Sequence, residues 1–438
     1  MQQKLAALVA RVFSSPEAGM TAIVGIVNRL VTAMVQFLTI RLFTDMLEVE
    51  HYAPLAVVTT GLLAWYMLAD AGLGASLQNF ISEARAKANS YDDFVVTGLW
   101  LALAIAGIFL LLILIATPLC SRLLLGDFSM ALAEKNSILL SAAAVFGLTT
   151  IAGIIYKYWF ALQRGYISNL LTAIANILGL ILLGIYWWKN VPFTPSMLII
   201  IMYGPACLLP LVTSLMVWLK HRAVGGKFCW PLARNMLERG GKFWFFALMS
   251  ACVLQVDYII LARTLPPHDI LVYTVATRLF MMILAFYNPI LFALWPVFAE
   301  NYVRRDVEGI KKSAMKALQL GGLMVVAGTL AIALGRHIIL PILTPTSPVE
   351  ISWPLIGLFF VYLLCRIWTD TLAIIIQAMN DFKVLWLAVP IQAVFSVGLQ
   401  YMGVQYWGLH GLVLGQILCF ALSVMWIFPL RLRQKLQQ

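Results

Sequence analysis

The sequence predicts an all-α polytopic membrane protein, and three observations lead to this fold class. Hydrophobic residues make up 62% of the 438 positions, and the mean hydropathy is +0.91. Charged residues make up only 11%, less than half of the roughly 25% that is usual in soluble proteins. Apolar segments long enough to span a bilayer, about 20 residues each, recur along the whole chain. This composition excludes a soluble globular, disordered, collagen-like or coiled-coil protein.

Twelve apolar segments are predicted to be membrane spans. They run near residues 19–43, 52–69, 94–117, 136–160, 166–188, 194–219, 243–263, 269–298, 315–335, 351–377, 384–405 and 409–430. The amphipathic stretch 1–13 is expected to form an interfacial helix that leads into the first span. The second span is expected to continue as a helix through Asp70 to about Ala84. The longest link between spans is residues 220–242.

The distribution of basic residues predicts the orientation. The chain has 30 Lys+Arg against 19 Asp+Glu, a net charge of +11. In a membrane protein this excess first indicates orientation, so we expect no nucleic-acid partner. With the N-terminus placed inside, 21 basic residues fall in cytoplasmic segments, six in outer segments and three within spans. The positive-inside rule therefore predicts that both termini are cytoplasmic.

An internal repeat appears at an offset of 221 residues, about half of the chain length. Residues 63–66 (Leu-Ala-Trp-Tyr) match residues 284–287 (Leu-Ala-Phe-Tyr), and Tyr52 matches Tyr273 at the same offset. Such a short match could arise by chance in so biased a composition. The shared offset and the six spans in each half favour duplication.

The repeat predicts two six-helix lobes. An even number of spans returns the chain to its starting side, so both halves have the same orientation. A pseudo-two-fold axis along the membrane normal would then relate them, with a substrate site between the halves. The predicted parts are an N-terminal lobe over 1–219, which includes the interfacial helix and spans one to six, a basic cytoplasmic linker over 220–242, and a C-terminal lobe over 243–438.

Enzyme function has little support in the sequence. There is no GxxxxGK[ST] phosphate-binding loop, no GxSxG and no HExxH motif. The five histidines lie at span ends or in links, and the outer links are too short to carry a catalytic domain. We expect no catalytic residue, no metal site and no cofactor.

Six charged residues fall inside or at the ends of predicted spans. They are Arg29, Asp70, Asp257, Arg278, Arg366 and Asp370. A charge at bilayer depth costs at least about 2.5–3.5 kcal/mol, so each is either paired inside the protein or functional. Arg366 and Asp370, four residues apart, lie on one helix face and are as well explained by pairing as by function. Asp257 could pair with Arg278 in the next span, whereas Arg29 has no carboxylate within a turn.

The three arginines predict an anionic ligand, because a guanidinium group binds phosphate oxygens through a planar fork of donors. Arg29, Arg278 and Arg366 are therefore the candidate substrate-binding residues. Asp70, Asp257 and Asp370 are candidates either for ion coupling or for charge pairing. Most aromatic residues are expected at lipid-facing or interfacial positions. Those proposed to line a cavity are Trp65, Tyr66, Phe286 and Tyr287.

Several motifs resemble a known family. Asn28-Arg29 in the first span and the segment 70–74 (Asp-Ala-Gly-Leu-Gly) resemble the polysaccharide-transporter branch of the multidrug/oligosaccharidyl-lipid/polysaccharide (MOP) exporter superfamily. Segments 255–261 and 273–279 agree in the second half. Within this branch the chain is most similar to O-antigen flippases (Wzx type). The likeness covers essentially the whole chain, but its loose apolar motifs specify the superfamily better than the substrate.

The resemblance implies a function. Members of that family move undecaprenyl-diphosphate-linked oligosaccharides, such as O-antigen repeat units, across the bacterial inner membrane through a cationic cavity. The implied partners are this substrate, membrane lipids, and polysaccharide polymerase and chain-length proteins. A multidrug or small-solute antiporter on the same scaffold is the alternative, because such relatives also have twelve spans. A non-transporting assembly factor is a third reading.

Overall fold

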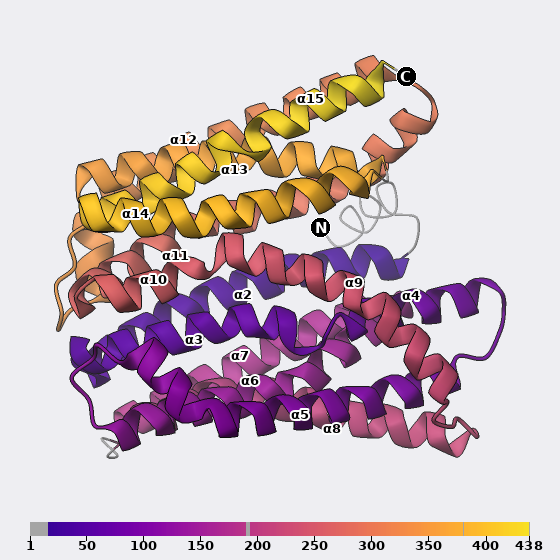
Figure 1. Cartoon of the computed structure of the whole chain (residues 1–438), viewed down its shortest axis with the longest axis horizontal. Helices are drawn as coiled ribbons and strands as arrows, with labels where there is room; N and C mark the ends of the chain where they lie inside the picture. The colour runs from indigo at the N-terminus through magenta and orange to yellow at the C-terminus, as the bar shows by residue number, and fades with distance from the viewer. Residues whose placement is uncertain (1–15, 190–192, 380, 438) are drawn as a thin grey trace, which may run out of the picture. The chain divides into compact units, whose positions relative to one another are not determined.

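The computed structural model describes residues 16–189, 193–379 and 381–437, and every regular element in these ranges is an α-helix (Figure 1). The helices are α2 (Pro16–Met46), α3 (Val49–Ala69), α4 (Leu73–Ala86), α5 (Asp92–Leu125), α6 (Leu132–Ala161), α7 (Gly165–Trp188), α8 (Pro195–Ala223), α9 (Trp230–Leu254), α10 (Val256–Thr264), α11 (Pro267–Val303), α12 (Val307–Leu343), α13 (Trp353–Ala378), α14 (Phe382–Leu422) and α15 (Val424–Leu436). The predicted all-α membrane fold is confirmed. The interfacial helix predicted for residues 1–13 lies outside the described residues.

Many of these helices are suited to a bilayer. In the described part of the chain, nine helical stretches are long and apolar enough to cross a membrane, or ten if α9 and α10 together form one bent span. Each of the twelve predicted spans overlaps a helix or one arm of a broken helix. The count of twelve crossings and the pseudo-two-fold symmetry stay predictions.

The prediction that the second span continues as one helix through Asp70 was wrong. Helix α3 ends at Ala69 and α4 begins at Leu73. Between them Ala71 has φ 49° and Gly72 has φ 70°, both in the left-handed region. The backbone carbonyl of Gly240 in α9 passes so close that a Cβ on Gly72 would overlap its oxygen. Glycine therefore permits both the turn and the close approach of α9.

The eleventh and twelfth predicted spans lie on either side of a break inside α14. Trp407 and Gly408 have non-helical backbone angles, and Gly408 has a positive φ of 55°. The two arms meet closely, because a Cβ on Gly411 would overlap the carbonyl oxygen of Gly403. Small residues at such positions allow helices to approach at backbone distance.

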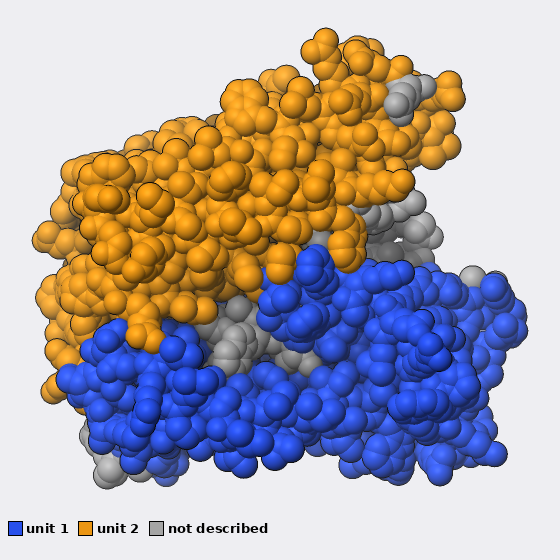
Figure 2. Space-filling view, in the orientation of Figure 1, with its two compact units in different colours: residues 1–47, 57–248 blue, residues 48–56, 249–438 orange. Residues whose placement is uncertain are grey.

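The described chain divides into two compact units, coloured separately in Figure 2. Unit 1 takes the described residues up to Leu47 and Val57–Leu248, and unit 2 takes Glu48–Ala56 and Met249–Gln438. The predicted link 220–242 is helical except at residues 224–229. The lobe boundaries predicted from the sequence stay predictions.

The core of unit 1 forms around α6, which contacts α4, α5, α7 and α8. Leu73, Leu77 and Ile81 bury one face of α4 against α5 and α6. Ala233 and Met236, at the start of α9, join the same buried cluster. The amphipathic face of α4 thus explains why this short helix docks on the bundle.

The core of unit 2 forms around α13, which contacts α11, α12, α14 and α15. The rings of Phe280 and Phe359 stack with their centroids 4.8 Å apart.

Several helices begin at residues whose side chains accept hydrogen bonds from free backbone N–H groups. In unit 2, Asp306 accepts from the N–H of Gly309 and Ser352 from that of Leu355.

Substitution of Gly72 by Ala is expected to destabilise unit 1. The left-handed backbone alone costs a non-glycine residue about 1–2 kcal/mol, and the new methyl group would meet the Gly240 carbonyl. We expect Gly72→Ala to lower membrane abundance and the melting temperature of the purified protein. Gly107→Ala is the matched control, because a Cβ added to this helical residue would meet no other described segment within 4 Å. Equal melting temperatures for the two variants would contradict this account of Gly72.

Candidate functional site

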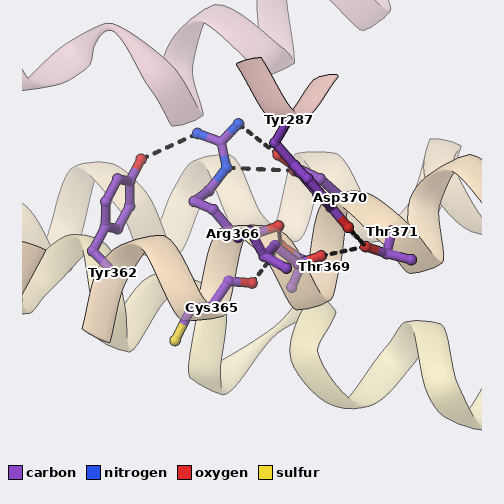
Figure 3. Close-up of polar contacts among 8 residues, drawn as sticks. Tyr287, Tyr362, Cys365, Arg366, Thr369, Asp370 and Thr371 are labelled. Atoms are coloured by element: carbon purple, nitrogen blue, oxygen red, sulfur yellow. Dashed lines mark hydrogen bonds and ion pairs between the residues drawn. The ribbon is translucent and has the colours of Figure 1, made fainter. Parts of the chain in front are cut away.

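An ion pair lies within α13 of unit 2, between Arg366 and Asp370 (Figure 3). The Nη2 of Arg366 donates to Oδ2 of Asp370 at 3.1 Å, and its Nε donates to Oδ1 at 3.4 Å. The side chains are 14% and 25% exposed. This is the two-pronged geometry in which a guanidinium group best offsets the desolvation of a carboxylate.

Aromatic side chains complete the surroundings of Arg366. Its Nη1 donates to the hydroxyl of Tyr362 at 3.2 Å, one turn earlier on α13 (Figure 3). The guanidinium carbon also lies 5.5 Å from the ring centre of Phe420 on α14. Arg366 therefore has a carboxylate, a hydroxyl and an aromatic ring as partners within its own unit.

A second polar group of unit 2 is centred on Asp257, in the first turn of α10. The chain leaves α9 at Gln255, and the turn places the Asp257 carboxylate inside the unit, where the residue is only 5% exposed. Asp257 accepts a hydrogen bond from the hydroxyl of Tyr273 on α11 and from the backbone N–H of Tyr258. The amide of Gln416 on α14 donates to the Tyr273 hydroxyl at 3.0 Å. These bonds join three helices through one buried carboxylate.

Helix α11 also carries Arg278, Phe286 and Tyr287. Arg278 is partly buried, one turn beyond Thr274, whose hydroxyl accepts from that of Tyr258. Tyr287 is fully buried, and its hydroxyl lies 2.7 Å from that of Thr371, next to Asp370. Phe286, its neighbour in sequence, is 37% exposed. Of these two candidate cavity aromatics, only Tyr287 joins the polar groups of unit 2.

In unit 1, Arg29 is partly buried on α2. Close to it in sequence, the hydroxyl of Thr32 bonds to Asn28, and the amide of Asn176 on α7 donates to Thr32 at 3.0 Å. This small network fixes α2 against α7. Arg29 lies on the same helix as this network, one residue after Asn28.

Asp70 lies in the turn between α3 and α4 and acts as a local cap. Its two carboxylate oxygens accept from the backbone N–H groups of Gly72 and Gly74, at 2.9 Å and 3.2 Å. A carboxylate at a helix N-terminus satisfies free donors and interacts favourably with the helix dipole. Trp65 and Tyr66 lie in α3, but their side chains are outside the described part of the structure.

The sequence analysis missed the hydroxyl partners of the buried charges and one buried network in unit 1. There His221 lies between Tyr158, whose hydroxyl is 3.0 Å from Nε2, and Asp92, whose carboxylate contacts Nδ1. His221 is 4% exposed. A signal was present, because all three residues lie near ends of spans that the sequence predicts to be on the same side of the membrane. Nothing in the spacing, however, joins residues so far apart in sequence.

The described residues contain no group of three or more His, Cys, Asp or Glu side chains that could hold a metal ion. The polar groups of unit 2 instead combine charged, hydroxyl and amide side chains from α10, α11, α13 and α14. Ionisable residues inside membrane helices commonly belong to substrate or ion pathways. Side chains of these kinds can bind ions and exchange contacts with one another.

Comparison with solved structures shows the fold. The chain matches a structure described as the inward-facing conformation of a multidrug resistance MATE family transporter of the MOP superfamily, with a TM-score of 0.73 and 16% identity. The match covers 95% of this chain and 99% of that chain. An outward-facing MATE family transporter matches with a TM-score of 0.65, over 96% and 97% of the two chains. The fold is therefore that of MOP superfamily transporters.

Sequence comparison then defines the family. The family model described as polysaccharide biosynthesis protein matches residues 20–302. A putative O-antigen export protein of Yersinia pseudotuberculosis is 33% identical over 413 residues, 93% of each chain. A putative O-antigen transporter of Salmonella typhimurium is 33% identical over 404 residues, 92% of this chain and 93% of that one. The chain belongs to the polysaccharide biosynthesis protein family, and the resemblance to its O-antigen branch is confirmed.

The Arg366–Asp370 pair supports a test that separates structure from function. Removing one member of a buried pair leaves an uncompensated charge and costs about 3–5 kcal/mol. We therefore expect Arg366→Leu and Asp370→Leu each to lower the amount of protein in the membrane. The double variant should regain abundance if the pair is structural. Abundance is measured by immunoblot of purified membranes, and transport by export of surface polysaccharide.

The matched control is the exposed pair Arg234–Glu238, which has the same spacing of four residues with side chains 75% and 62% exposed. Its single and double leucine variants should all be abundant and active, since exposed pairs contribute little. A double variant at 366 and 370 that is abundant but does not transport would contradict a purely structural role.

Proposed function

We propose that this protein is a flippase that moves a lipid-linked oligosaccharide, an O-antigen or related repeat unit carried on undecaprenyl diphosphate, across the bacterial inner membrane. The observation that carries the proposal is the 33% identity, over 93% of both chains, to a relative named as an O-antigen export protein. The family match over residues 20–302 agrees with it. The relatives are named as exporters and transporters, so we propose transport without an enzymatic step.

The charged residues suit this substrate. A diphosphate is a dense anion, and a guanidinium group stays protonated and binds its oxygens in pairs. Arg29 and Arg278 lie in different units and are both partly buried. We propose that these two residues contact the diphosphate or acidic sugars during transport. Arg366 already binds Asp370 and Tyr362, so its proposed contact with substrate would require that pair to open.

The proposed transport cycle is alternating access. Residues 1–219 and 243–438 would act as the two lobes, joined through 220–242, with both termini in the cytoplasm. The positive-inside distribution supports this orientation. Polysaccharide polymerase and chain-length proteins are the proposed partners. A multidrug or small-solute antiporter is the alternative function, supported by fold alone because the drug-transporter neighbours share only 16% identity.

Complementation tests the function directly. The full chain is expressed in a strain that lacks its own O-antigen transporter, together with the enzymes that make the cognate repeat unit. We expect surface polysaccharide to be restored, as scored by gel electrophoresis of extracted lipopolysaccharide. Restored drug resistance without restored polysaccharide would favour the antiporter instead. A chain that is abundant in the membrane and restores neither activity would contradict both.

The role of the two arginines is tested in the same strain. Arg29→Ala and Arg278→Ala should each abolish polysaccharide export while membrane abundance stays near that of the wild type. The lysine variants should recover only part of it, because an ammonium group keeps the charge but loses the two-pronged geometry. Arg304→Ala is the control, since that arginine is 70% exposed and paired with Glu300. Normal export by both alanine variants would reject the proposed contacts.

A further inference from the structure

Unit 1 contains a cavity of about 520 Å³ that the proposed transport mechanism does not use. It lies where the C-terminal ends of α4, α6 and α8 come together. Its polar wall is made by Arg85, Arg164, Lys220, Tyr91, Tyr158 and Trp159. Three of these side chains are cationic, and no carboxylate is among the residues that line the cavity in the described part of the chain.

The three cations come from three separate parts of the sequence. Arg85 belongs to the last turn of α4, Arg164 precedes α7, and Lys220 belongs to the last turn of α8. The positive-inside rule places all three segments on the cytoplasmic side. All three cationic side chains line one cavity, as expected for residues on the same side of the membrane. The positive charge is therefore concentrated there.

Two of the cations differ from the third in their contacts with the described residues. Within the described residues, the side chains of Arg164 and Lys220 form no hydrogen bond or ion pair, and both residues are exposed. Arg85 differs, because its Nη1 donates to the carbonyl of Ala161 at the end of α6, at 2.6 Å. A structural role as partner of a helix C-terminus thus explains Arg85. It does not explain Arg164 and Lys220.

Hydrogen bonds and ring packing fix the aromatic residues that line the cavity. The hydroxyl of Tyr158 is bonded to His221, which is in turn bonded to Asp92. The ring of Tyr158 packs edge-on against Trp159, with centroids 5.1 Å apart. The indole N–H of Trp159 is buried and has no hydrogen-bond acceptor among the described residues. A buried donor of this kind is stabilised when an acceptor reaches it.

The rim of the cavity continues into an apolar surface on α8. Met216 lines the cavity and is 64% exposed, and Leu215 and Leu219 beside it are 57% and 52% exposed. Exposed apolar side chains on a membrane helix are suited to lipid tails. The site therefore offers cations and aromatic groups at its polar end and a tail-binding surface beside them.

We propose that this cavity binds the phosphate headgroup of an anionic lipid. Basic pockets between membrane helices on the cytoplasmic side are known to suit such headgroups, and aromatic residues are favoured at this depth. The phosphate is held by Arg164 and Lys220, with Arg85 adjacent, while the acyl chains lie along α8. The site does not depend on which solute the protein transports. Its ligand is a membrane lipid with a phosphate group.

Lipid binding to the purified full chain tests the proposal. The protein in detergent is titrated with dioleoylphosphatidylglycerol, and with dioleoylphosphatidylcholine as the zwitterionic comparison, and bound lipid is counted by native mass spectrometry. The wild type should bind the anionic lipid preferentially. The double variant Arg164→Gln, Lys220→Gln should bind it roughly 25-fold more weakly, about fivefold for each charge. The charge-retaining exchange Arg164→Lys, Lys220→Arg should keep most of the affinity.

The matched control is Lys312→Gln with Lys316→Gln, which removes two exposed charges on α12 from the same predicted side. This variant should bind like the wild type. If both double variants bind the anionic lipid equally weakly, the loss of affinity follows from net charge alone. That result would overturn the proposed site. Inorganic phosphate at about 10 mM is enough to fill a simple anion site. Complete displacement of the lipid at this concentration would overturn the lipid assignment. Melting temperatures of all variants show whether they are folded.

Discussion

A polar group inside a bilayer has no water to bind, and this constraint explains the way the chain is built. Helices satisfy the backbone, and charged side chains must find partners within the protein. Arg366 binds Asp370 and Tyr362, and Asp257 binds the hydroxyl of Tyr273. Even Asp70, in a turn between helices, has its carboxylate oxygens bonded to backbone N–H groups.

The same constraint explains which parts of the fold the sequence could predict. A span needs about 20 apolar residues, so its presence is visible in the composition of a local window. The break in α14 at Trp407 and Gly408 could be predicted in the same way, because it falls between two apolar segments. The turn at Gly72 is different, because it depends on the carbonyl of Gly240 in a distant helix. The local sequence therefore predicted a helix that continues through Asp70 and did not predict the end of α3.

The candidate site was predictable only in part, for a related reason. A spacing of four residues is enough to predict that Arg366 meets Asp370. The hydroxyl groups of Tyr273 and Tyr362 could not be chosen from the sequence, because most aromatic residues in such a chain face lipid or the interface. Phe286 and Tyr287 illustrate the difficulty, since adjacent residues of one helix are 37% exposed and fully buried. Burial depends on how α11 is rotated against α12 and α13, which requires the tertiary structure.

Arg366 on the one hand, and Arg164 and Lys220 on the other, show two physical settings of basic residues in this chain. Arg366, within a helix, is neutralised by a nearby carboxylate, and removing that partner leaves a costly charge. Arg164 and Lys220, at helix ends, are exposed, and neither side chain forms a hydrogen bond or ion pair with the described residues. An exposed charge of the second kind can bind an external anion without first breaking a contact of its own. The positive bias at helix ends, which serves as an orientation signal, thus also supplies the exposed cations from which a lipid-phosphate site can be made.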